Sequence, residues 1–110
     1  MTIRCHPLLI AATLLVVVPL ANAQDAQALQ ARSLAATCAQ CHGTDGRVPP
    51  GSAMGALAGM PAPYLAEQMK AFKSGVRAGT VMPQLAKGFS DAQIERLAGY
   101  FAQVAPGAKP

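Results

Sequence analysis

This sequence contains the stretch Cys38-Ala39-Gln40-Cys41-His42, from which most of its architecture follows. On one turn of helix, residues three apart lie on the same face, so the Cys38 and Cys41 thiols can reach a single flat ligand. His42 follows directly and can turn its imidazole toward the same ligand. The stretch therefore predicts a site where two sulfurs and one ring nitrogen meet.

A C-x-x-C pair followed at once by histidine is typical of covalent attachment of c-type haem. In this interpretation Cys38 and Cys41 form thioethers with the two vinyl groups of the porphyrin, and His42 is an axial ligand of the iron. The cysteine spacing alone also fits half of a zinc site or a dithiol redox pair. The cellular compartment of the chain therefore helps to decide between covalent haem, a zinc site and a dithiol redox pair.

Residues 1–23 have the pattern of a secretory signal peptide. Arg4 is basic, an apolar run follows at residues 8–18, and Ala21-Asn22-Ala23 forms a small-x-small cleavage site. The apolar run is short for a membrane-spanning helix, which needs about 20 residues. We therefore expect cleavage after Ala23 and export to the periplasm, where haem attachment is possible, with no membrane span in the mature chain.

Cleavage at this point would simplify the inventory of candidate ligands. Cys5 and His6 would be lost, leaving one cysteine pair and one histidine. Residues 24–110 would carry a formal charge of +3, because Arg4 is lost from a total of +4. A chain this short forms one domain with a thin core, and a buried porphyrin would supply an apolar centre. No dense basic run with interleaved aromatics is present, which argues against nucleic-acid binding.

The domain is predicted to be all-α, with three main helices and loops wrapped around one covalent haem. The first helix is expected at about residues 25–40, with Asp25 as its cap and the cysteines at its carboxyl end. The second is expected at residues 63–74, between a proline at its first turn and Gly75. A long irregular segment rich in glycine and proline separates them at residues 43–60.

The third helix has the clearest signals. Ser90 and Gln93 form the two ends of a capping box. The spacing of the apolar residues that follow predicts one buried face, made by Ile94, Leu97, Ala98 and Phe101. In the second helix, a similar stripe is made by Leu65, Met69 and Phe72.

The second axial ligand must come from another residue type, since His42 is the only histidine after cleavage. Met82 is the predicted ligand, because Pro83 stiffens what we expect to be a loop. Met60 and Met54 are alternatives, as is an open position, whereas Met69 belongs to the predicted core stripe. His/Met ligation would raise the reduction potential and fill both axial positions.

The sequence resembles the small bacterial class I c-type cytochromes. The motif at residues 38–43, Met82-Pro83 and a last helix ending in Leu97-Ala98-Gly99-Tyr100-Phe101 carry this resemblance. It implies the class I cytochrome c fold, with the first and last helices crossing beside the haem. It also implies Cys38 and Cys41 as attachment points, His42 and Met82 as iron ligands, and a carbonyl of Pro49 or Pro50 as acceptor for the histidine N–H.

A narrower resemblance is to the cytochrome subunit of flavocytochrome c sulfide dehydrogenases. Residues 57–59, 64–68, 71–75, 80–82 and 86–91 carry it, although Met60 stands where that family often has glutamine. The resemblance implies a redox protein partner, a flavoprotein sulfide dehydrogenase subunit, and no substrate site in this chain. The alternative is a thiol–disulfide oxidoreductase that uses Cys38 and Cys41, but that chemistry normally sits on a βαβ scaffold, for which the sequence has no strand pattern.

Overall fold

A computed structural model of the protein describes residues 21–107. The predicted signal segment lies outside this range except for its last three residues, which belong to the first turn of a helix. Within the described range every regular element is helical, in the order α1 (Ala21–Ala36), α2 (Ala39–His42), the 3-10 turn η1 (Thr44–Gly46), α3 (Ala62–Ser74), α4 (Met82–Ala86) and α5 (Asp91–Gln103). The predicted all-α class is confirmed.

Two of the three predicted main helices have the expected bounds and signals. α3 has Pro63 in its first turn and ends at Ser74, followed by Gly75, which adopts the left-handed conformation with φ of 82°. α5 opens with the complete capping box: Ser90 Oγ accepts from the Gln93 N–H at 3.2 Å, and Gln93 Oε1 accepts from the Ser90 N–H at 2.8 Å. These caps satisfy backbone donors that a bare helix end would leave unpaired.

The prediction for the first helix is wrong at both of its ends. Asp25 is not a cap, because α1 already begins at Ala21. The helix also ends at Ala36 and restarts as α2, so the cysteines do not lie on its carboxyl end. Around the break the Cys38 N–H donates to the Ala35 carbonyl and the Thr37 hydroxyl donates to the Leu34 carbonyl, which tightens the last turn.

α4 was not predicted. Met82 was expected in a loop and held extended by Pro83, but it is the first residue of this short helix and Pro83 is the second. Proline is well tolerated in a first turn, where its missing N–H would have no partner. The same signal correctly placed the start of α3, but a helix of five residues is too short to show periodicity.

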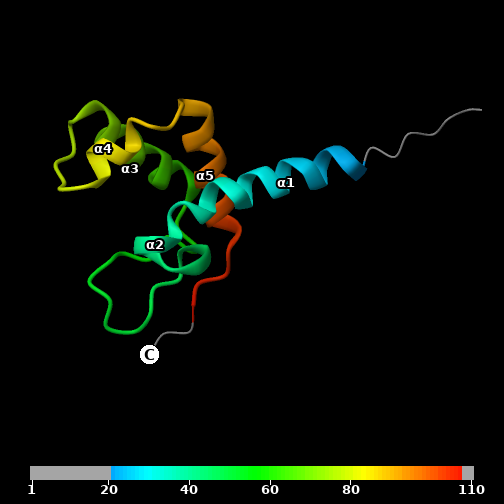
Figure 1. The fold of residues 1–110 in the computed structure, drawn as a ribbon, viewed down its shortest axis with the longest axis horizontal. Coiled ribbons are helices and arrows are strands. Elements are labelled where there is room, and N and C mark those ends of the chain that lie inside the picture. The colour runs from blue at the N-terminus through cyan, green and yellow to red at the C-terminus, as the bar shows by residue number, and fades with distance from the viewer. Residues whose placement is uncertain (1–20, 108–110) are drawn as a thin grey trace, which may run out of the picture.

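The core lies where α3 and α5 pack together, with α4 against α3 and α1 against α5. The predicted apolar face of α5 is confirmed, because Ile94, Leu97, Ala98 and Phe101 are all buried. α3 contributes Leu65, Ala66 and Met69, while α1 and α4 contribute one alanine each, Ala35 and Ala86. Figure 1 shows α1 crossing α5, as the class I cytochrome resemblance implies.

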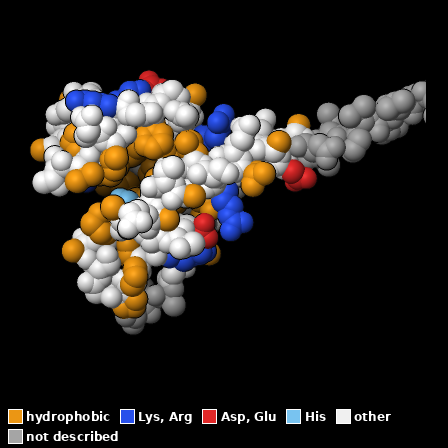
Figure 2. Space-filling view, in the orientation of Figure 1, with side chains coloured by type: hydrophobic (Ala, Val, Ile, Leu, Met, Phe, Trp, Pro, Cys, Tyr) orange, Lys and Arg blue, Asp and Glu red, His pale blue; other side chains and the backbone are white. Residues whose placement is uncertain are grey.

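Two parts of the chain lie on either side of a hollow that the space-filling view shows (Figure 2). α2, η1 and residues 47–60 form what we call the motif half, and α3, α4 and residues 75–90 form the α3–α4 half (Figure 1). α2 packs chiefly against η1 and α1, whereas α4 packs against α3. The two halves are therefore joined through α1 and α5 rather than by direct packing of α2 on α4.

We expect Leu97→Ala to destabilise the folded protein by ~2–5 kcal/mol, because the side chain is 1% exposed and its loss leaves a cavity. Leu29→Ala is the matched control: Leu29 is also helical but 66% exposed, so the change should stay within about 0.5 kcal/mol. Denaturant unfolding of both holo-variants measures the difference. Equal effects would show that α5 is not the centre of the core.

Candidate functional site

The two cysteines lie three residues apart on one short helical segment. Cys38 has helical backbone angles (φ −83°, ψ −18°) and its carbonyl accepts from the His42 N–H at 2.9 Å, while Cys41 lies within α2. Both thiols are free: neither is part of a disulfide. Both sulfurs therefore lie on one helical turn, as predicted, and can bond to a single macrocycle.

Burial raises the pKa of the Cys38 thiol above its usual value, against a smaller lowering by the Thr37 hydroxyl. A half-buried thiol with a raised pKa is a poor nucleophile at neutral pH, because thiol–disulfide exchange requires the thiolate. Redox-active C-x-x-C pairs have the opposite property, a lowered pKa. The environment of Cys38 thus fits a sulfur that becomes a thioether better than one that cycles through a disulfide.

His42 is oriented by a hydrogen bond to the loop that follows the motif. Its Nδ1 lies 2.7 Å from the carbonyl oxygen of Gly55. A carbonyl only accepts, so Nδ1 carries the proton and Nε2 keeps its lone pair free for a metal. The carbonyl of Pro49 or Pro50 that the resemblance implied does not play this part. The chain turns at these prolines, and Gly55 further along the loop meets the ring instead.

Gly43 shapes the turn that directs the chain away from the histidine. Its backbone is in a region with φ of 77°, and a Cβ added there would lie 2.0 Å from the carbonyl oxygen of Arg47. Only glycine fits such a position without displacing backbone. The path of the backbone therefore requires glycine at position 43, directly after the motif.

A polar network that sequence reasoning missed fixes the next turn. Asp45 is in the left-handed conformation with φ of 54°, which is unfavourable for a residue with a side chain. Its Oδ1 accepts from the Tyr100 hydroxyl at 2.7 Å, and its Oδ2 is 3.5 Å from the Arg47 guanidinium. Arg47 Nε also donates to the Ala105 carbonyl at 2.9 Å. Residues far apart in sequence thus hold η1 against the end of α5.

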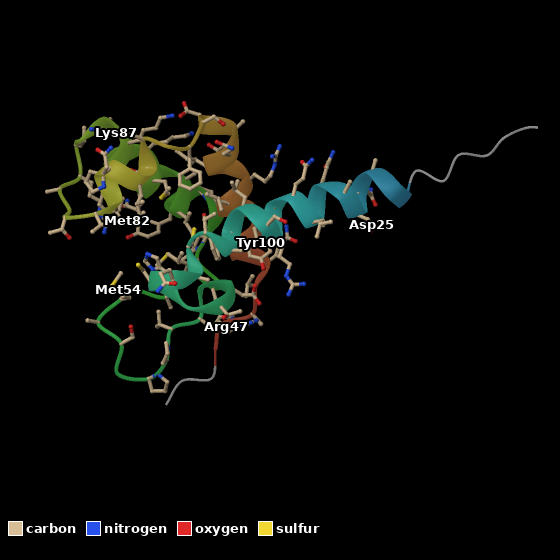
Figure 3. All side chains as sticks on the ribbon, viewed as in Figure 1. Asp25, Arg47, Met54, Met82, Lys87 and Tyr100 are labelled. Carbon is tan, nitrogen blue, oxygen red and sulfur yellow. The ribbon has the colours of Figure 1, made fainter. Side chains whose placement is uncertain are left out.

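The methionines lie in different environments. Met69 is buried in the core, as predicted. Met60 and Met82 are half-buried and pack against the core, and Met54 is 41% exposed. Figure 3 shows Met82 on the α3–α4 half, at the margin that faces the motif half, and Met54 on the motif half. Met82 and Met54 are therefore on opposite sides of the space between the halves.

The space between the halves suits a flat apolar group. Figure 2 shows it as a hollow in the surface with hydrophobic side chains on both sides and the histidine at its edge. The half-buried residues that pack on the core include Cys38, which directly precedes α2, and Met82, the first residue of α4. Free thiols, an oriented imidazole and a thioether are the donor set of a covalent haem, so the residues present fit this group.

Known proteins agree with this assignment of class. Residues 21–101 match the family model described as "Cytochrome C oxidase, cbb3-type, subunit III". The structure is similar to that of a cytochrome c4 from Acidithiobacillus ferrooxidans, with a TM-score of 0.65 and 28% identity over 72% of this chain and 51% of the other. The fold is thus that of a class I cytochrome c. The chain belongs to this cytochrome c family, and it carries covalent haem c with its iron.

Curated relatives carry more specific names. The chain is 42% identical over 76 residues to the "Thiosulfate dehydrogenase electron acceptor" of Thiomonas intermedia. This match covers 69% of this chain and 35% of that protein. It is also 37% identical over 71 residues to the "Cytochrome subunit of sulfide dehydrogenase" of Chlorobaculum tepidum. This second match covers 64% of this chain and 63% of that protein. The matches thus span only part of each relative's length.

Other metal and membrane features are not found in the part of the chain that the structure describes. Between residues 21 and 107 there is no group of three or more histidine, cysteine or acidic side chains that could hold a metal ion without haem. Nor does this range contain a helix long and apolar enough to cross a membrane.

We expect the Tyr100–Asp45 hydrogen bond to contribute about 1 kcal/mol at neutral pH and to be lost at alkaline pH. The hydrogen bond from Tyr100 to Asp45 raises the pKa of the phenol above its ordinary value of 10, so the neutral phenol is favoured in the folded state. The contribution is complete below pH 10 and disappears as the pH rises through the folded-state pKa.

The difference in unfolding free energy between wild type and Tyr100→Phe, measured from pH 7 to 11.5, checks this. Tyr64→Phe is the matched control, since Tyr64 is 48% exposed. A stability difference between wild type and Tyr100→Phe that is independent of pH would contradict the assigned bond.

Proposed function

We propose that this chain is an exported, periplasmic one-electron carrier in which Cys38 and Cys41 attach the haem and His42 and Met82 are the axial iron ligands. One observation carries the proposal above all. The His42 ring is held through Nδ1 by the Gly55 carbonyl, which leaves Nε2 for the iron, and Met82 lies across the hollow on α4. His42 and Met82 come from opposite halves, so both could hold the iron of a haem bound in the hollow.

The other methionines are less suited to the sixth position. Met69 is packed in the core, and Met54 lies on the same half as His42, one residue from Gly55. Met60 packs against the core and remains the principal competitor. Met82 opens a short helix that packs on α3, so its position is set by secondary structure as well as by Pro83.

The proposed ligands have chemical consequences for the carrier. When bound, the haem supplies a one-electron couple at its iron. The Met82 thioether is a soft, neutral donor that favours the reduced state and so raises the potential. The Gly55 carbonyl fixes the orientation and the tautomer of the His42 imidazole through the Nδ1 hydrogen bond. If His42 and Met82 both held the iron, the chain would leave no position on it for a substrate, and only electrons would be exchanged.

The partner that we propose is a dehydrogenase that oxidises reduced sulfur compounds. Relatives named as an electron acceptor of thiosulfate dehydrogenase and as a cytochrome subunit of sulfide dehydrogenase support this assignment. The pattern of residues 1–23 supports export, with cleavage after Ala23. In this function the chain accepts single electrons from the dehydrogenase and passes them to a further redox protein.

The alternative, a thiol–disulfide oxidoreductase, has less support. The βαβ scaffold typical of that chemistry is missing from residues 21–107, where all regular elements are helical. The raised pKa of Cys38 also disfavours a reactive thiolate. Covalent haem, once attached to both sulfurs, leaves neither available for exchange.

Replacing Met82 by leucine removes the sulfur at nearly constant volume. We expect Met82→Leu to open the sixth position, so that the reduced protein binds carbon monoxide whereas the wild type does not. The reduction potential should fall by ~100 mV or more, within the ~0.8 V range that axial ligands set. Absorption spectra under carbon monoxide and a redox titration measure both effects.

The matched controls are Met54→Leu and Met60→Leu, which remove the competing sulfurs in the same way. Both should retain a closed haem and a potential close to that of the wild type. If Met60→Leu opened the site and Met82→Leu did not, Met60 would be the ligand and the proposed pair would be wrong.

The proposed partner is tested with native extract. After size exclusion at low salt, the haem absorption should elute together with a dehydrogenase activity. That activity should reduce the cytochrome when sulfide or thiosulfate is added. Co-elution with a flavoprotein would identify a subunit of a sulfide dehydrogenase, whereas reduction by thiosulfate in a separate fraction would identify a free acceptor. No reduction by either compound would exclude this class of partner.

A further inference from the structure

The amino-terminal half of α1 is not covered by any other part of the described chain. Every residue from 23 to 30 is exposed, and Leu29, the one large hydrophobic side chain among them, is 66% exposed. The helix becomes half-buried only at Ala31, and Ala35 is the one residue from 23 to 36 that is buried. Figure 1 shows this half extending beyond the rest of the described chain. We call residues 23–30 the arm.

The arm is regular helix although it packs on nothing in the described chain. Its alanines and glutamines are good helix formers. In proteins, however, most of the stability of a helix comes from the packing of one face and not from propensity. The arm therefore presents a formed helical surface that another element can cover.

A groove lies between α1 and α5 and offers a place for such an element. On the α1 side it is lined by residues of the arm, Leu29 among them, and on the α5 side by Gly99, Tyr100 and Val104. The charged residues that line it are Arg32 and Arg96, and both are cations. The groove thus combines apolar side chains with a positive charge, which suits a helix that carries a carboxylate.

The two charges of α1 have no partner in the described chain. Asp25 and Arg32 take part in none of the ion pairs found among residues 21–107. Within α1 the residues three and four positions from each are uncharged, so neither forms a pair along the helix. By contrast, Lys70 and Lys73 of α3 each pair with a carboxylate of α5. The charges of the core helices are thus matched inside the molecule, whereas those of α1 are not.

The exposed stripe of α1 is complementary to itself. Asp25, Leu29 and Arg32 follow at i, i+4 and i+7 and so lie on one stripe of the helix. Asp25 comes three residues before Ala28, and Arg32 comes three residues after Leu29. Two copies that pack antiparallel about a twofold axis therefore bring each Asp25 opposite Arg32 of the other copy, with the two Leu29 side chains between these pairs. Figure 3 shows Asp25 near the outer end of α1, clear of the other helices.

We propose that the arm is the interface of a symmetric homodimer, in which each arm lies antiparallel to the other along the groove between α1 and α5. Asp25 of one copy pairs with Arg32 of the other, and Leu29 of each copy packs against the apolar side chains of the other's groove. The charge pairs set the register and the direction of the two helices. The dimer uses neither the cysteine motif nor a candidate axial ligand, so it does not rest on the proposed function.

The interface is small, because each copy contributes about two turns of helix and one leucine. Interfaces at the low end of the size range bind weakly. We therefore expect a dissociation constant on the order of 10–100 µM. Sedimentation equilibrium of the mature holoprotein from ~1 to ~500 µM spans this range and reads only mass, so its result is independent of which residue binds the iron.

The first test reverses the charges one at a time and then together. Asp25→Arg and Arg32→Asp each place like charges opposite one another and should weaken the dimer by ~10-fold or more. The double variant Asp25→Arg/Arg32→Asp restores opposite charges and should recover to within ~5-fold of the wild type. Because the double variant carries both substitutions, its recovery excludes misfolding as the cause of the single losses. A double variant as weak as the single variants would overturn the proposal.

The second test concerns the apolar contact. Leu29→Ser should weaken the dimer by ~10-fold or more, whereas the matched control Val76→Ser should stay within ~2-fold, since Val76 is 85% exposed but lies outside the arm. At ~1 µM, where the chain is monomeric, denaturant unfolding of Leu29→Ser should agree with the wild type to within about 0.5 kcal/mol. A dimer equally sensitive to both substitutions would show that the arm is not the interface.

Two further outcomes would overturn the proposal. One is a wild-type protein that stays monomeric at ~500 µM and ~50 mM salt, where exposed charges are only partly screened. The other is a wild type that is monomeric alone but loses its co-elution with the dehydrogenase when Leu29→Ser is introduced, because the arm would then bind a different protein. A wild-type dimer that weakens when salt is raised to ~0.5 M supports the charge pairs, since screening acts on them directly.

Discussion

The hydrogen bond between the His42 ring and the Gly55 carbonyl is the constraint on which the site depends. It settles which nitrogen of the only histidine in the described range carries a proton, and so which one is free for iron. It also joins the exposed loop of residues 47–60 to α2. The base of that loop is fixed separately, because Leu57 and Ala58 donate their N–H groups to the Gly46 carbonyl. Ring and loop therefore position each other.

The small core explains why the two halves need a ligand between them. Nine residues make the buried cluster, and eight of them come from α3, α4 and α5. The motif half contributes no buried hydrophobic side chain to it. Burial of a large apolar ring in the hollow would therefore complete a contact that the polypeptide leaves open. A haem bound there would be a structural partner as well as the seat of the redox chemistry.

The sequence was sufficient where the determinants are local and form a recognisable pattern of caps or apolar spacing. The capping box at Ser90 and the apolar spacing that starts at Ile94 specify α5 within a few residues, and Pro63 with Gly75 does the same for α3. The break before Cys38 and the short helix that begins at Met82 were missed, because each depends on one or two hydrogen bonds and not on a repeating pattern.

Long-range contacts were beyond prediction from one sequence for a different reason. The acceptor for His42 depends on how a loop without regular structure folds back, and nothing in the spacing of Pro49 or Gly55 determines that. Similarly, Asp45 and Tyr100 meet only because α5 crosses near the motif half. The charge pairs of Lys70 and Lys73 follow from the register of α3 on α5, which the helical periodicity of each alone does not give.

Contacts from α5 and the residues after it hold the motif half. These contacts limit where the chain could be extended or cut. Gly59 donates to the Phe101 carbonyl at 2.8 Å, and Arg47 donates to the Ala105 carbonyl, so the anchors of the loop continue to the second residue after Gln103. A fused domain or affinity tag can begin beyond Gly107 without breaking them. A truncation before Ala105 would instead release one edge of the haem crevice, although it would remove no ligand and no core residue.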